Sequence, residues 1–255
     1  MTALLTIDHL TKSFGGIHAV NNVSLQLPED KIVTVMGPNG AGKTTVFNLI
    51  TGIYTVDEGQ VRLQGKDLTN QSQEAITHAG IARTFQNIRL FSGLSCLENV
   101  MCAHDPLIKY NLLNCVFPSP KKLRSDRQNR ELSLSYLETV GIAEYKDEDP
   151  FSLPYGLQRK LEIARALATL PKVLLLDEPA AGLNTVEVQE MMELIQKIKQ
   201  NHDLSVLLID HRMELVMGLS DYIYVLNFGE LLAEGTPQEI QANPEVQRVY
   251  VGGED

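Results

Sequence analysis

A glycine-rich segment near the front of the chain restricts its fold more than any other feature. Residues 37–44 read Gly-Pro-Asn-Gly-Ala-Gly-Lys-Thr and fit the pattern G-x-x-x-x-G-K-[ST], in which glycines let successive backbone N–H groups turn toward one anion. A strand-like apolar run, 32–36, precedes the segment, and a run with helical spacing, 45–50, follows it. This order predicts an α/β fold with a phosphate-binding loop. The residues expected to bind the phosphates of a nucleotide are Gly37, Pro38, Asn39, Gly40, Ala41, Gly42, Lys43, Thr44 and Thr45.

Two acids much later in the chain supply chemistry that a phosphate loop lacks. The apolar run 173–176 predicts a buried strand that ends in Asp177 and Glu178. Lys43 can then reach the β- and γ-phosphates, and Asp177 can lie beside a Mg²⁺ ion that the Thr44 hydroxyl also ligates. Glu178 can lie beside an attacking water. Strands that end in solvated acids are common in other proteins, so the acids are informative only together with the loop. Both segments together predict a nucleoside triphosphatase.

Composition agrees with one intracellular α/β protein. A chain of 255 residues with 44% hydrophobic content can bury a full core. Its 22 basic and 32 acidic residues give a net charge of −10, which disfavours a chain whose whole surface binds nucleic acid and leaves a local basic patch as the alternative. We find no apolar run near eighteen residues and no signal peptide, and therefore expect a soluble protein. Three cysteines, Cys96, Cys102 and Cys115, form no C-x-x-C pair and fit a reducing compartment.

The chain changes character twice along its length. Residues 1–88 and 171–255 alternate strand-like runs with turns, and in the second part a helical stretch, 186–199, separates the acid-bearing run from another apolar run, 204–209. That order predicts a βαβ unit. Residues 89–170 instead have helical spacing, with a proline- and charge-rich loop expected at 118–122. We expect one 255-residue domain with an α/β core and an inserted helical subdomain at 89–170.

A third segment indicates which kind of nucleoside triphosphatase the chain resembles. Residues 152–160, Ser-Leu-Pro-Tyr-Gly-Leu-Gln-Arg-Lys, precede a helical run at 161–167 and stand about fifteen residues before the acid-bearing strand. In this setting the segment resembles the signature motif of ATP-binding cassette (ABC) proteins, usually Leu-Ser-Gly-Gly-Gln. The resemblance covers nearly the whole chain, in order and at family-like spacing. The other positions that match the family are Phe14, Gln86, residues 181–184 and His211.

This resemblance implies a fold and a set of roles. The fold is a RecA-like P-loop NTPase core with an antiparallel β subdomain and the inserted helical subdomain. Phe14 would stack on adenine, Gln86 would offer its amide oxygen to Mg²⁺ or water, and His211 would donate a hydrogen bond to the γ-phosphate or its water. Two cassettes would sandwich two ATP, with the signature helix of one facing the phosphate of the other. The signature residues expected to bind that nucleotide are Leu153, Pro154, Tyr155 and Gly156.

Several segments look like the ATPase subunits of importers for branched-chain and other hydrophobic amino acids. They are 80–91, 97–100, 109–130, 177–184 and 244–250. Urea-type importers and the lipopolysaccharide-export ATPase are close relatives and remain alternatives, as does a soluble cassette ATPase. The implied partners are a second cassette, membrane permease subunits and, indirectly, a solute-binding protein, and the implied location is the inner face of the cell membrane. The segment 88–97, with Phe91 exposed, is the expected permease contact, and the alternative is that Phe91 is buried.

Three positions depart from the family pattern. Pro154 stands where the signature motif has serine, Leu157 where it has glutamine, and Asn184 where the D-loop has an acid. Proline suits the first position of a helix, since its φ is preset and its missing N–H would be unpaired there. We therefore expect an intact helix start with one hydroxyl contact fewer, which predicts a slow or asymmetric ATPase.

Overall fold

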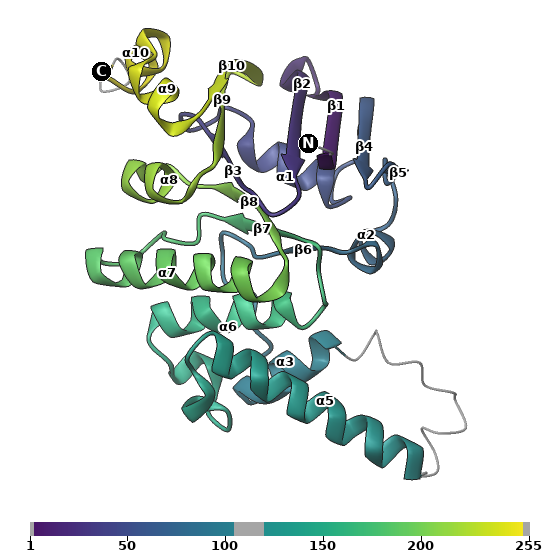
Figure 1. Ribbon diagram of the computed structural model, residues 1–255. Coiled ribbons are helices and arrows are strands. Elements are labelled where there is room, and N and C mark those ends of the chain that lie inside the picture. The colour runs from purple at the N-terminus through teal and green to yellow at the C-terminus, as the bar shows by residue number, and fades with distance from the viewer. Residues whose placement is uncertain (1–2, 105–119, 252–255) are drawn as a thin grey trace. The chain divides into compact units, whose positions relative to one another are not determined.

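The computed structural model describes residues 3–104 and 120–251 (Figure 1). The chain divides into two compact units, each of which is treated by itself below. The first, called here the core unit, combines Met1–Arg83 with Lys172–Asp255. The second, the helical unit, is Thr84–Pro171. The division that we expect from the sequence has its borders at residues 88/89 and 170/171.

A six-stranded sheet forms the centre of the core unit. Its strands are β3 (Ile32–Met36), β6 (Ile81–Arg83), β7 (Val173–Asp177), β8 (Ser205–Ile209), β9 (Tyr222–Asn227) and β10 (Glu230–Gly235). They lie in the order β10-β9-β3-β8-β7-β6, and only β10 pairs antiparallel. Every residue of β3, β7 and β8 is buried, as expected for parallel strands covered on both faces. Helix α7 (Thr185–His202) connects β7 to β8, which confirms the predicted βαβ unit.

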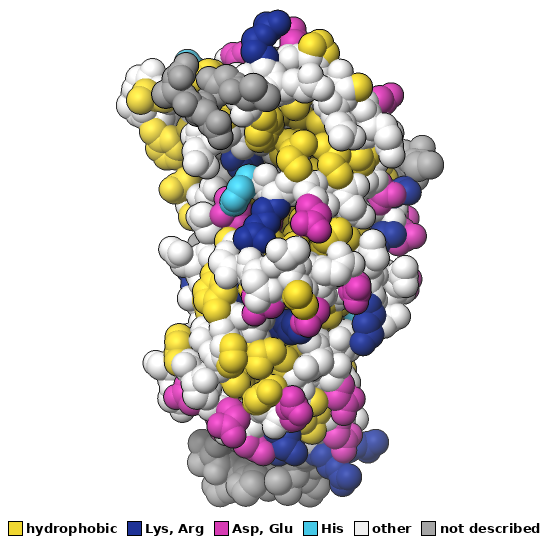
Figure 2. All heavy atoms as spheres, turned by 90° about the vertical axis from the view of Figure 1, so that its left-hand side faces the viewer, with side chains coloured by type: hydrophobic (Ala, Val, Ile, Leu, Met, Phe, Trp, Pro, Cys, Tyr) yellow, Lys and Arg dark blue, Asp and Glu magenta, His cyan; other side chains and the backbone are white. Residues whose placement is uncertain are grey.

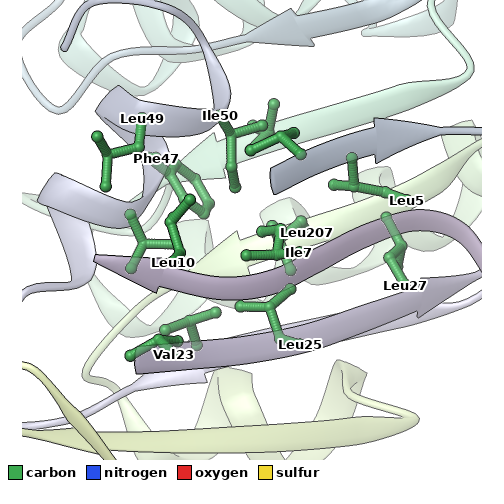
Figure 3. Close-up of a cluster of buried hydrophobic side chains, with 14 of the residues drawn as sticks. Leu5, Ile7, Leu10, Val23, Leu25, Leu27, Phe47, Leu49, Ile50 and Leu207 are labelled. Carbon is green, nitrogen blue, oxygen red and sulfur yellow. The ribbon is translucent and has the colours of Figure 1, made fainter. Parts of the chain in front are cut away.

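A second sheet of the core unit is antiparallel. Its strands are β1 (Ala3–Phe14), β2 (Ile17–Pro28), β4 (Glu58–Leu63) and β5 (Lys66–Asp67), in the order β2-β1-β4-β5. The apolar side chains of β1 and β2 meet helix α1 (Lys43–Ile50) and strand β8, so both sheets share one hydrophobic cluster (Figure 3). Helix α2 (Gln73–Ala79) contributes Ile76 to this cluster. The labelled members are Leu5, Ile7, Leu10, Val23, Leu25, Leu27, Phe47, Leu49, Ile50 and Leu207. This antiparallel sheet beside a P-loop core confirms the predicted fold class.

Three short helices complete the core unit at its C-terminal end. They are α8 (Met213–Leu219), α9 (Pro237–Ala242) and α10 (Pro244–Val251). Thr236 caps α9 in a capping box, because its hydroxyl accepts from the Glu239 amide while the Glu239 carboxylate accepts from the Thr236 amide. Pro237 at the first helical position has the φ that the helix needs. On the face shown in Figure 2, acidic and basic side chains are interspersed.

In the described part of the helical unit, 84–104 and 120–171, three helices pack together and two 3₁₀ turns follow the second of them. The helices are α3 (Cys96–His104), α5 (Pro120–Thr139) and α6 (Tyr155–Leu167), and the turns are Ala143–Tyr145 and Pro150–Ser152. Because α5 already begins at Pro120, the loop predicted at 118–122 is wrong for its last three residues, and a proline at the start of a helix explains the error. Residues 118 and 119 and Cys115 lie outside the described residues. Within the described residues, neither Cys96 nor Cys102 takes part in a disulfide. None of the helices in the described ranges is long and apolar enough to cross a membrane.

Candidate functional site

The phosphate loop lies between β3 and α1, as its sequence context predicts. Two of its glycines are required by close backbone approaches, because a Cβ atom at Gly37 would lie 2.2 Å from the Leu226 carbonyl oxygen and one at Gly42 2.4 Å from that of Ala19. Gly42 also has a φ of 95° at the N-cap of α1. The backbone of β9 and β2 therefore holds the loop in place.

Lys43 is the first residue of α1 and is 7% exposed. Its ammonium donates hydrogen bonds to the carbonyl oxygens of Gly37, at 2.7 Å, and Pro38, at 2.8 Å. Burial lowers the pKa of this ammonium, and the carboxylates of Glu178 and Asp177 partly offset the change. The structure thus brings the lysine of the loop and the two acids predicted from the sequence into one electrostatic site.

Asp177 ends β7 and is paired with a cation for which the sequence analysis predicts no role. The guanidinium of Arg83, in β6, donates to its Oδ2 at 2.6 Å, and both side chains are almost fully buried. Arg83 also donates to Asn48, at 2.7 Å, and to the Thr51 hydroxyl, at 3.2 Å, which are both in or next to α1. Arg83 is a charged residue at the end of a short, otherwise apolar strand, and a buried charge needs a partner. The sequence therefore indicates that Arg83 is paired, but it does not identify the partner.

Glu178 and His211 lie beside each other in the core unit. The backbone of Glu178 adopts a left-handed φ of 48°, and its amide donates to the Ile209 carbonyl at 2.8 Å. This turn directs the carboxylate, 16% exposed, toward the His211 imidazole, with 3.7 Å between Oε1 and Nδ1. His211 is more open and lies two residues before the start of α8, with the N-cap Arg212 between them. The pair can accept a proton from a water and hold that water in place.

Two residues tie the loop after β7 to the loop after β8. Arg212 donates from its guanidinium to the Leu183 carbonyl oxygen at 2.9 Å. The carboxylate of Asp210, 1% exposed, accepts from the Arg212 amide at 2.9 Å. Burial raises the pKa of Asp210, and the amides of Arg212 and Ala180 oppose the rise. Neither residue has a role that the sequence predicts, and only their position beside His211 could have suggested one.

Asn184 caps helix α7. Its side chain accepts from the amides of Val186, at 2.9 Å, and Glu187, at 3.0 Å, and the Glu187 carboxylate accepts from the Asn184 amide. Asn and Asp serve about equally well at this position. The departure from the family acid therefore preserves the start of the helix.

Phe14, the residue expected to stack on adenine, ends β1 with its side chain partly open. Its ring is 44% exposed and packs edge-on against Tyr54, with 5.1 Å between the ring centroids. The Lys12 ammonium lies 5.5 Å from the centroid of the Phe14 ring. An aromatic ring that is held on one side and open on another can accept a planar base.

In the helical unit, the signature segment leads into α6. The expectation that Pro154 is the first helical residue is wrong by one position, since Pro154 is the N-cap and the helix begins at Tyr155. The Pro154 carbonyl accepts from the amides of Leu157 and Gln158, so the helix start is intact without a side-chain cap. The Ser152 hydroxyl donates to the Asp149 carbonyl at 2.7 Å.

Arg159, in α6, connects the signature helix to the segment that carries Gln86. Its guanidinium donates to the carbonyl oxygens of Phe85, at 2.7 Å, and Gln86, and to the Tyr155 hydroxyl at 2.7 Å. Arg159 is buried and pairs with Glu162 at 3.1 Å. The Gln86 residue is exposed, while its backbone is held by Arg159. No role for Arg159 is predicted from the sequence, although a buried arginine in an amphipathic helix indicates a hydrogen-bond network.

The segment expected to contact a permease is only partly at the surface. Phe91 is 49% exposed, as predicted, with the Arg165 guanidinium 4.7 Å from its ring centroid. Cys96 and Leu97 are buried in α3. The accessible part of 88–97 therefore ends before α3.

Comparison with known proteins identifies the family. The model of the family described as ABC transporter matches residues 20–181. The chain is 44% identical over 249 residues, 98% of both chains, to the high-affinity branched-chain amino acid transport ATP-binding protein BraF of Pseudomonas aeruginosa. The chain belongs to the ABC transporter family. It is an ATPase of that family.

Further comparisons give the same family for this ABC ATPase. It is 45% identical, again over 98% of both chains, to the ATP-binding protein LivG of Salmonella typhimurium. A model described as branched-chain amino acid ATP-binding cassette transporter matches residues 230–255. Its fold is similar to the ADP conformation of the cassette MJ1267, with a TM-score of 0.85 and 29% identity over 99% of this chain and 100% of the other. It is also similar to the dimeric cassette MJ0796 bound to ADP and Pi, with a TM-score of 0.78 and 25% identity over 91% and 98% of the two chains.

Proposed function

We propose that this chain is the ATP-hydrolysing subunit that energises import of branched-chain or other hydrophobic amino acids. The observation that carries the proposal is the similarity to BraF and LivG over 98% of each chain, including the module at residues 230–255. The chain powers transport, and other subunits would select the solute.

Nucleotide binding falls to the phosphate loop and Phe14. The residues 37–45 supply backbone amides and the Lys43 ammonium to the phosphates, while the open Phe14 ring receives the adenine. Lys43 is already within the field of Asp177 and Glu178, where a γ-phosphate would replace the loop carbonyls as its partner. Such charge-assisted contacts are stronger than neutral ones.

Mg²⁺ is the metal that these residues would hold. Thr44, Asp177 and Gln86 offer a hydroxyl, a carboxylate and an amide oxygen, and hard oxygen donors are the ligands that Mg²⁺ prefers. Thr44 is exposed at the start of α1, and Asp177 is oriented by Arg83. When bound, the ion neutralises charge on the phosphates.

Hydrolysis relies on Glu178 and His211. Glu178 acts as general base toward the water, and His211 positions that water or the γ-phosphate. A second cassette completes the site through its residues 153–156, where the amides of Tyr155 and Gly156 at the start of α6 face the phosphate. The dimeric form of MJ0796 supports the presence of a second cassette. ATP closes the dimer, and loss of phosphate reopens it.

The remaining partners follow from this role. The exposed segment around Phe91 contacts membrane permease subunits, and a solute-binding protein delivers the amino acid to them. The chain then lies on the cytoplasmic face of the membrane as a peripheral subunit. Nucleic acid is not a partner, consistent with the net charge of −10.

The test is reconstitution of this chain with membrane permease subunits. ATP-dependent uptake of labelled leucine into vesicles is expected with wild-type protein, and urea serves as the unrelated solute. Glu178→Gln is the matched variant, and it should still bind ATP but lose roughly 10²–10⁴ in turnover. Leucine uptake that proceeds equally with Glu178→Gln, or urea uptake in place of leucine uptake, contradicts the proposal.

A further inference from the structure

A cavity of about 600 Å³ opens in the core unit between the antiparallel sheet and the six-stranded sheet. Residues of β1, β2, β9 and β10 and of the start of β3 line it, and in Figure 1 β2 lies beside β9 and β10. The cavity lies at the amino ends of the parallel strands β3 and β9, whereas the phosphate loop follows the carboxyl end of β3. It is therefore separate from the nucleotide site, and its volume is typical of sites for small molecules, roughly 300–1,000 Å³.

Apolar and aromatic side chains form part of the lining. Ile7 of β1 and Leu25 of β2 are buried, and Figure 3 shows both within the larger hydrophobic cluster. Tyr222 and Tyr224 alternate along β9 and therefore face the same side of the sheet, with their rings edge-on and 5.3 Å between the ring centroids. The Gln26 amide donates to the Tyr224 hydroxyl at 3.1 Å, which holds that ring in place. The cavity thus has a fixed aromatic wall.

The charges of the lining do not cancel. Among the described residues that line the cavity, the charged ones are Lys31, Asp8, Asp221 and Glu234. Lys31 donates to Asp221 at 2.8 Å, and Asp8 accepts at 3.2 Å from Arg62, which lies outside the lining. Glu234 is exposed, and its side chain forms no hydrogen bond or ion pair with the described part of the chain. The lining therefore holds one negative charge without a compensating cation.

This charge acts on the aromatic wall. Burial raises the pKa of Tyr222 and of Tyr224, and the nearby Glu234 carboxylate raises both further. The face of an aromatic ring attracts a cation, and a carboxylate beside the ring adds to that attraction. Lys31 does not compete for this place, because it is already paired with Asp221. The cavity thus offers a cation two kinds of attraction at one point.

We propose that this cavity is a binding site for a small organic cation, in which an ammonium group lies between Glu234 and the rings of Tyr222 and Tyr224. The apolar or aromatic body of that cation extends over Ile7 and Leu25, where it replaces water against buried side chains. An anion of the same size would be repelled by the Glu234 charge, and a neutral molecule would gain only the apolar contact. The site does not depend on the proposed ATP hydrolysis, because its lining residues lie apart from the phosphate loop.

The test titrates the nucleotide-free chain with the 2-phenylethylammonium ion and follows backbone amide signals by NMR. Two matched probes are 2-phenylethanol, which has the same length without the charge, and phenylacetate, which is an anion of similar size. We expect saturable binding of the cation with a dissociation constant of about 1–10 mM, ordinary for a ligand of that size. The signals that shift should lie at 24–33 and 221–234, and both other probes should bind at least about fivefold more weakly.

Variants separate the charge from the aromatic wall. Glu234→Gln keeps the shape of the side chain and should weaken binding of the cation about two- to fivefold. The control is Glu230→Gln on the same strand, whose carboxylate accepts from Asn21 at 2.7 Å outside the cavity, and it should bind as wild type does. Tyr222→Leu removes a ring and should weaken binding about two- to fivefold, whereas Tyr222→Phe keeps the ring and should retain binding.

Thermal midpoints show that each variant is folded before its affinity is compared. Shifts that never saturate, or shifts confined to the segment around Phe14, overturn the proposal, since the cation then has no site in this cavity. Equal affinity for 2-phenylethanol and the cation overturns it as well, because the charge then contributes nothing. So do equal affinities of Glu234→Gln and Glu230→Gln for the cation.

Discussion

The ion pair between Arg83 and Asp177 allows a prediction of stability with a worked magnitude. The Arg83 and Asp177 side chains are 5% and 2% exposed, and 2.6 Å separates their charged atoms. Arg83→Met keeps much of the volume but leaves the carboxylate buried without its cation. Breaking a buried pair in this way costs about 3–5 kcal/mol, which corresponds to a drop of roughly 6–20 °C in the thermal midpoint.

Arg62→Met is the matched control for this measurement. Arg62 pairs with Asp8 at 3.2 Å, but the side chains are 42% and 38% exposed. Such a surface pair contributes about 0–1 kcal/mol. Equal losses in the two variants at pH 7 would refute the reasoning.

Three further predictions follow from single contacts. Lys43→Ala should abolish measurable ATP binding by calorimetry without unfolding the protein, because it removes the cation of the loop, and wild-type affinity would make the loop purely structural. Pro154→Ser should strengthen ATP-dependent dimerisation or raise hydrolysis, since it adds one hydroxyl donor at the start of α6, and unchanged dimer affinity and rate would mean that the departure is silent. Glu239→Gln should destabilise α9 at pH 7, and its thermal midpoint should approach that of wild type at low pH. The Thr236 amide and hydroxyl lower the pKa of Glu239. The stability that the Glu239 carboxylate contributes is therefore present above the ordinary pKa of 4.5 and is lost as the pH falls through the lowered pKa. Thermal midpoints of both proteins between pH 7 and pH 3 would show whether the difference persists.

Much of the core unit could be predicted because its signals are local in sequence. The phosphate loop, the strand before it and the helix after it form one continuous stretch, and the structure has them at 32–50. The buried strands β7 and β8 are near-continuous apolar runs, which only a sheet covered on both faces explains.

What the sequence could not predict is the pairing of residues far apart in the chain. Arg83 and Asp177 are separated by 94 positions, and Arg159 reaches the Phe85 carbonyl across 74. A backbone carbonyl has no sequence signature, so the backbone partners of Arg159 could not be predicted from the sequence. The prediction of a loop across the start of α5 at Pro120 was wrong for another reason, since proline is common both in loops and at helix starts.

The loops after β3, β7 and β8 meet because the carboxyl ends of parallel strands share one edge of the sheet. Hydrogen bonds and charge interactions between these loops then couple them to one another. The carboxylates of Asp177 and Glu178 raise the pKa of Lys43 against the effect of burial. The Glu178 amide donates to the carbonyl of Ile209, the last residue of β8, and Arg212 donates to the Leu183 carbonyl. Residues in one such network do not contribute independently, so removing Glu178 and His211 together should cost less than the sum of the separate losses. The loops therefore respond to a nucleotide as a group, since a displacement of one changes the hydrogen bonds that hold the next.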